Sequence, residues 1–276
     1  MSLTLTLRAQ PPVRVDASPL TPERCNALNS MRVAGLPLRC GRETVQVGDL
    51  FEVGGYVGDG TLTLAGDLRL LDRIGAGMTR GRLTVSGDCG DRVGAGMGGG
   101  ELTVDGAVGA YAGCEMAGGV LRIGGDAGAR LGGAYPGARA GMTGGEIVVS
   151  GHAGEETGAG MRRGLIAVGA RAGDGAGLRM LAGTVIALGG FGNHASVGQG
   201  NKRGTLVSGA AVEPNPFRYA FAARYRPPAL TLQLRRLRAL GLDVADALIA
   251  GPWARWSGDT TELGRGEILI FDEEES

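Results

Sequence analysis

The sequence predicts an all-β fold: a right-handed parallel β-helix, built as a single-stranded solenoid of seven to eight coils with about 19 residues per coil. A small N-terminal cap and a helical C-terminal cap are expected at its two ends. Three observations predict this fold. A glycine marker recurs at a nearly constant step, apolar residues alternate after each marker, and a methionine stands three residues before most of the next markers.

The glycine marker opens each repeat unit, and the steps between successive markers are 21, 19, 19, 26, 19, 19 and 21 residues. Aliphatic residues stand two and, in most units, four positions after the marker, and this alternation is typical of a short half-buried strand. Further glycines supply positive φ angles at the corners, which explains 54 glycines in 276 residues. The markers are Gly60, Gly81, Gly100, Gly119, Gly145, Gly164, Gly183 and Gly204.

The recurrent methionine predicts a column inside the coils. Stacked coils place equivalent residues about 4.8 Å apart, and parallel crossovers are right-handed. Thioethers can bind Cu(I), but no clustered His or Cys accompanies these residues, so packing is the favoured interpretation. The predicted structural core ladder consists of Met78, Met97, Met116, Met142, Met161 and Met180.

The chain divides into three predicted regions: an N-terminal cap segment over 1–50, the repeat domain over 51–210 and the C-terminal cap over 211–276. The first region has a helix start at Thr21 and ends in a strand over 48–53 that leads into the first coil. In the last region, leucines at helical spacing predict a helix that ends near Gly241, followed by a second over 243–250 and a strand over 264–271.

Candidate contact residues lie outside the regular repeat. The step of 26 residues contains an insertion over 133–139, and insertions in solenoids form loops on one face. Both tryptophans and several other aromatic residues belong to the C-terminal cap, and aromatic residues are enriched at protein interfaces. The candidate interface residues are Tyr135, Arg139, Phe217, Tyr219, Trp253 and Trp256.

Composition argues against several classes of partner. With 28 basic and 28 acidic residues the formal net charge is zero, so nucleic acid is not expected. No segment has the length and hydropathy of a membrane span or the pattern of a signal peptide, so we expect a cytoplasmic protein.

No constellation of acid, base, nucleophile or metal ligands is visible, so we expect no catalytic, cofactor-binding or metal-binding residues in this chain. The four cysteines lack CxxC spacing and are expected to be reduced thiols. Asp67, Asp88 and Asp126 share one coil position and are expected to form a solvated corner rather than a calcium site. His152 and His194 lie in different repeats without a nucleophile motif.

Several motifs together carry a family resemblance. They are the tandem Gly-x-Gly-Met coils, the stretch Val45-Gln-Val-Gly-Asp-Leu-Phe-Glu-Val53 and the ending Gly258-Asp-Thr-Thr-Glu-Leu-Gly-Arg-Gly-Glu-Ile-Leu-Ile270. In this combination the chain resembles the C subunit of formylmethanofuran dehydrogenase. The C-terminal domain of the glutamate synthase large subunit carries a similar β-helix, which supports the fold.

The resemblance implies a subunit of a C1-metabolism complex. In aerobic methylotrophic bacteria the similar protein belongs to the formyltransferase/hydrolase complex, which transfers a formyl group from tetrahydromethanopterin to a methanofuran-like carrier and releases formate. It implies an amidohydrolase-like A subunit, a B subunit and a formyltransferase D subunit as partners, with cofactors and hydrolase residues on those chains. The richness in Gly, Ala and Arg with a single lysine, Lys202, favours this bacterial version.

This chain is then a non-catalytic structural subunit of an enzyme complex. The alternatives are the C subunit of an archaeal-type molybdenum or tungsten formylmethanofuran dehydrogenase, and a stand-alone component related to glutamate synthase. A free-standing polysaccharide-active β-helix would require carboxylates lined along a groove, and that pattern is absent from the sequence.

Overall fold

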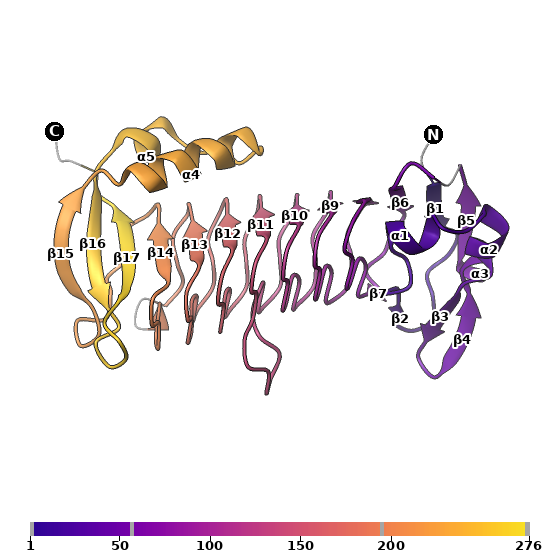
Figure 1. Cartoon of the computed structure of the whole chain (residues 1–276), viewed down its shortest axis with the longest axis horizontal. Helices are drawn as coiled ribbons and strands as arrows, with labels where there is room; N and C mark the ends of the chain where they lie inside the picture. The colour runs from indigo at the N-terminus through magenta and orange to yellow at the C-terminus, as the bar shows by residue number, and fades with distance from the viewer. Residues whose placement is uncertain (1–2, 56–57, 194–195, 274–276) are drawn as a thin grey trace.

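The computed structural model describes residues 3–55, 58–193 and 196–273, and in these residues the chain is mostly β. One sheet holds thirteen strands in the order β15-β16-β17-β14-β13-β12-β11-β10-β9-β8-β6-β1-β5, and a second holds four in the order β4-β3-β2-β7. The molecule is an elongated row of coils with the two chain ends at opposite ends of the row (Figure 1). This arrangement is compatible with the predicted parallel β-helix.

Every glycine marker leads into a strand of the large sheet, and these strands pair in parallel without a register shift. Leu102, for example, pairs with Leu83 on one side and with Leu121 on the other. A second line of parallel bridges joins successive coils, including those of Val108 with Ala127 and Ala127 with Ala153. The repeat strands are β6 (Thr61–Ala65), β8 (Arg82–Ser86), β9 (Glu101–Val104), β10 (Val120–Ile123), β11 (Glu146–Val149), β12 (Leu165–Val168), β13 (Thr184–Ala187) and β14 (Thr205–Ser208).

The six methionines of the predicted ladder are all fully buried. Each reaches the glycine marker of a neighbouring coil: a Cβ atom at Gly119 would lie 2.7 Å from Cε of Met97, and one at Gly145 would lie 2.9 Å from Cε of Met116. Gly119 also has a φ of +84°, which L side chains rarely adopt. The recurrent methionine and the recurrent glycine therefore form one packing unit that spans adjacent coils.

The N-terminal segment extends the large sheet. β1 (Leu3–Leu7) pairs in parallel with β6 and antiparallel with β5 (Phe51–Gly54), which is the sheet's edge. The strand predicted over 48–53 is wrong in its first half: residues 47–50 form the helical turn α3 (Val47–Leu50), and β5 turns back onto β1 instead of entering the first coil. The remaining elements here are α1 (Pro22–Cys25), α2 (Ser30–Ala34), β2 (Val15–Asp16), β3 (Pro37–Cys40), β4 (Glu43–Gln46) and β7 (Leu71–Asp72).

The C-terminal segment continues the sheet beyond the last repeat strand. β17 (Gly266–Phe271) pairs in parallel with β14, and β16 (Trp253–Gly258) and β15 (Ala220–Tyr225) follow antiparallel. The sequence predicted the helices α4 (Pro228–Ala239) and α5 (Asp246–Ala250) and the strand β17, but not the pair β15 and β16.

Helix α4 covers the outer face of the last repeat strands. Its buried leucines, Leu230, Leu234 and Leu237, belong to a second apolar core that is separate from the interior of the coils. Arg236 forms an ion pair with Glu146 of β11 at 2.7 Å, which holds the helix against the sheet. The third residue after each glycine marker points outward from the coils. It is polar in the four earlier coils, as Thr63, Thr84, Thr103 and Arg122, and apolar in the four later coils, as Val148, Ala167, Ile186 and Val207.

A buried carboxylate fixes the end of the coil stack to the C-terminal strands. Asp259, which is 0% exposed, accepts hydrogen bonds from the backbone N–H of Gly200 and from Thr261, and pairs with Arg218 at 2.6 Å. Burial alone would raise the pKa of Asp259, but the hydrogen bonds from Thr261, Gly200 and Arg218 outweigh it and hold that pKa below its usual value.

Candidate functional site

Burial keeps the cysteine thiols of the chain in their protonated form. Burial raises the pKa of Cys89 and of Cys114 to about 12 each, and that of Cys25 to about 11. The thiolate is the reactive form of cysteine, so these thiols are unreactive at neutral pH. All four cysteines are free and buried.

Metal chemistry finds no support in the parts of the chain that the structure describes, where no group of three or more His, Cys, Asp or Glu side chains could hold an ion. Asp67, Asp88 and Asp126 are all exposed, as expected for a solvated corner, and two of them also accept backbone hydrogen bonds from the next coil. Asp88 accepts a hydrogen bond from the N–H of Ala107 at 2.8 Å, and Asp126 accepts one from the backbone N–H of His152 at 2.7 Å. These carboxylates join one coil to the next, whereas Asp67 pairs with Arg69.

Of the two histidines, the structure describes His152 alone. His152 lies at a coil corner, where its Nδ1 accepts a 3.4 Å hydrogen bond from the backbone N–H of Arg171. His194 lies outside the described residues.

The insertion over 133–139 folds back onto the coils beside it. The ring of Tyr135 stacks on that of Tyr111 with centroids 5.3 Å apart, and the Arg130 guanidinium lies 5.9 Å from the Tyr111 centroid. Arg130 also pairs with Glu156 at 2.6 Å. Tyr111 and Arg130 occupy equivalent coil positions with φ near +60°, which sends both side chains outward from the same corner.

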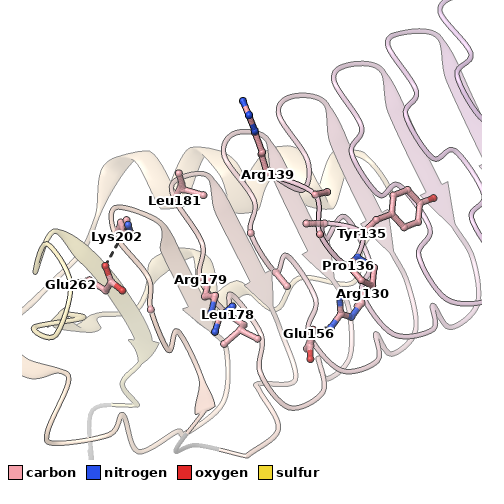
Figure 2. A pocket seen from close by; sticks show the side chains of 16 residues that line it. Arg130, Tyr135, Pro136, Arg139, Glu156, Leu178, Arg179, Leu181, Lys202 and Glu262 are labelled. Atoms are coloured by element: carbon pink, nitrogen blue, oxygen red, sulfur yellow. Dashed lines mark ion pairs between the residues drawn. The ribbon is translucent and has the colours of Figure 1, made fainter.

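A groove of about 520 Å³ lies between this insertion and the loop that carries Glu262. Figure 2 shows Tyr135 and Arg139 at one end of the groove and the ion pair of Lys202 with Glu262 at the other. The structure thus brings the two predicted contact residues of the insertion to the rim of one hollow. Arg179, which sequence reasoning did not single out, also lines it.

The C-terminal edge of the large sheet carries a second candidate surface. Phe217 is 88% exposed, and Phe221 is 56% exposed and packs edge-on against Trp256 with ring centroids 5.8 Å apart. Every residue of the edge strand β15 is exposed. Phe221 belongs to the aromatic C-terminal cap predicted as a contact surface, but it was not among the candidate interface residues and its strand was not predicted.

Two of the predicted contact residues are buried within the chain, so they form no contact surface. Tyr219 is 2% exposed and its hydroxyl donates a 2.8 Å hydrogen bond to the carbonyl of Gly198. Trp253 is 1% exposed and packs against Phe271 beneath α4 and α5. Both side chains fill the junction between the C-terminal segment and the coils.

Comparisons with known proteins point to one family. No family model matches the sequence. A curated relative, the C subunit of the formyltransferase/hydrolase complex Fhc of Methylorubrum extorquens, is 39% identical over 87 residues, which is 32% of this chain and 32% of that relative.

A solved structure extends this match to the whole chain. It is the crystal structure of the formyltransferase/hydrolase complex FhcABCD from Methylorubrum extorquens with methylofuran, of which one chain aligns at a TM-score of 0.90 and 38% identity, covering 98% of this chain and 100% of that chain. Among the described residues, no helix is long and apolar enough to cross a membrane. The identity and coverage of the match to the solved structure show that the chain belongs to the family of C subunits of the formyltransferase/hydrolase complex.

Proposed function

We propose that this chain is a non-catalytic structural subunit of a formyltransferase/hydrolase complex. That complex would transfer a formyl group from tetrahydromethanopterin to a methanofuran-like carrier and release formate. The observation that carries the proposal is the likeness over the full chain, at 38% identity, to a subunit of a complex solved with methylofuran. The same likeness favours the bacterial complex over an archaeal-type dehydrogenase or a glutamate-synthase component.

The positions of the side chains support the proposed structural role. The coil interior is filled by methionine and aliphatic side chains, and the buried thiols have raised pKa values. We propose a right-handed parallel β-helix over 51–210 as the rigid body of the subunit. The segments 1–50 and 211–276 would act as the caps that close its two ends.

The partners would be an amidohydrolase-like A subunit, a B subunit and a formyltransferase D subunit, and the assembly would be cytoplasmic. The proposed contact residues are the exposed or half-buried ones of the predicted set, namely Tyr135, Arg139, Phe217 and Trp256. Tetrahydromethanopterin and the methanofuran-like carrier would be bound by the other subunits, with no cofactor held by this chain.

The test is to purify the chain alone and together with the A, B and D subunits from the same genome. We expect the isolated chain to lack formyl transfer and formyl hydrolysis, and the four-subunit assembly to have both. Omitting this chain should prevent or weaken assembly. Turnover by the isolated chain, or an active A, B and D assembly that excludes this chain, would refute the proposal.

A further inference from the structure

Five arginines without a counter-ion gather on one flank of the coils, although the whole chain has a net charge of zero. Within the described part of the chain, no ion pair or side-chain hydrogen bond involves any of them. All five are exposed, and they line two hollows, one of about 520 Å³ and one of about 460 Å³. They are Arg139, Arg162, Arg163, Arg179 and Arg203.

The repeat places these side chains in rows. Arg162, Leu181 and Lys202 occupy equivalent positions in three successive coils. The backbone N–H of each donates a hydrogen bond to the carbonyl of a ladder methionine one coil earlier: Met142, Met161 and Met180, in that order. One residue further on stand Arg163, Ala182 and Arg203. Equivalent side chains two coils apart are separated by about 10 Å. The small Ala182 thus leaves a gap between Arg163 and Arg203 that is open to an incoming carboxylate.

The carboxylates beside these rows are already paired. Of the residues lining the two hollows, Glu156 pairs with Arg130 at 2.6 Å and Glu262 with Lys202 at 3.5 Å. The local excess of positive charge is therefore not neutralised by this chain. A cluster of like charges is repulsive on its own and attracts an acidic surface.

Apolar and aromatic side chains lie among the arginines. Leu181 lines both hollows, and Leu178 and Tyr135 line the larger one (Figure 2). Arginine together with aromatic and aliphatic residues is the composition typical of a protein–protein interface, whereas nucleic-acid surfaces depend on phosphate contacts with little apolar content. The charges also extend over several coils and two hollows, which is more than a single small anion can contact.

We propose that this arginine flank is the docking site for an acidic surface of another subunit of the complex, with an apolar side chain of that subunit against Leu181. The inference rests on the proposed function. In it, a carboxylate of the partner occupies the gap that Ala182 leaves between Arg163 and Arg203, and the insertion over 133–139 forms one rim of the contact.

The test uses the full chain co-produced with the A, B and D subunits. We expect R163E/R203E to weaken its association with them by at least about ten-fold at low salt, and the wild-type affinity to fall between about 50 and 300 mM salt. R163Q/R203Q should give a smaller loss. The matched control is R39E/R42E, which makes the same change in charge at the opposite end of the molecule, on and beside β3. Unchanged thermal midpoints establish that each variant is folded.

A second measurement reports position directly. Because the native cysteines are buried, Ala182→Cys carrying a thiol-linked photocrosslinker should capture one of the other subunits, whereas Arg42→Cys should not. If wild-type chain does not assemble at all, the proposed function fails. If wild-type and R163E/R203E assemble equally, or if the double variant loses only the binding of a single-stranded DNA 20-mer, the docking site is refuted while the proposed function stands.

Discussion

Replacing Met116 by lysine tests the methionine column at its middle. Met116 is fully buried, and the equivalent positions on either side of it are Met97 and Met142, so the column offers no carboxylate to pair with an ammonium group. Loss of a buried methionine costs about 2–3 kcal/mol of transfer free energy, and burial of an unpaired charge adds several more. We therefore expect Met116→Lys to lower the free energy of unfolding by about 4 kcal/mol or more.

For a chain of this size, such a loss corresponds to a fall in the thermal midpoint of about 10 °C or more. Circular dichroism near 218 nm, a strand signal, would follow the transition. Met116→Leu is the matched control, because it keeps the volume and apolar character and should cost less than about 1.5 kcal/mol. A thermal midpoint that Met116→Lys leaves unchanged would contradict the placement of this column in the core.

Three further predictions follow from local geometry. Gly119→Ala should lower the thermal midpoint by more than Gly96→Ala. Both glycines have positive φ, but only a Cβ at Gly119 would meet neighbouring atoms within 3 Å. Equal shifts of the two midpoints would contradict the contact with Met97. Cys89 and Cys114 should resist iodoacetamide at pH 8 in the native protein, because burial raises the pKa of each thiol to about 12. Both should react after unfolding in urea, and mass spectrometry would detect the difference. Rapid labelling of the native protein would contradict the burial of these thiols. Asp259→Asn should lower the midpoint at pH 7: the pKa of Asp259 lies below its ordinary value of 3.8, so the ionised carboxylate stabilises the fold above that pH, and this contribution is lost as pH falls through the lowered pKa. The difference from wild type should shrink below about pH 4, and an undiminished difference at pH 3 would argue against this role.

The repetitive part of the chain was predictable because its information is periodic. One glycine and one methionine per coil report a backbone corner and an interior position, and the predominance of strands in one large sheet is confirmed. The outward residue of each repeat strand held a further signal. Its change from Arg122 to Val148 in the next coil marks where α4 begins to cover the sheet.

The two ends of the molecule could not be derived in the same way. Leu3–Leu7 has the alternation of a strand. Its pairing with β6 could not be predicted, because its partners Leu62 and Leu64 lie far away along the chain. In the C-terminal segment, aromatic enrichment does not distinguish an internal junction from an exterior contact. Tyr219 and Trp253 therefore needed coordinates to be assigned to the interior.

Within the coils, surface candidates were predicted only where an irregular step of the repeat marked them. The insertion over 133–139 stands out as a broken step, which identified Tyr135 and Arg139. Arg163 and Arg203 lie 40 residues apart and become neighbours only when the coils are stacked and counted by register. A search for charge runs along the chain does not detect them.

Because the repeat strands pair without a register shift, each coil adds the same fixed length to the protein. The strands β9 and β10 make equivalent pairings 19 residues apart in the chain. Duplicating residues 100–118 would therefore add one coil, or about 4.8 Å, without altering either end. The separation between anything held at β1 and anything held at β17 is thus set in whole steps by the number of coils. Evolution or design can lengthen this spacing only by a full unit.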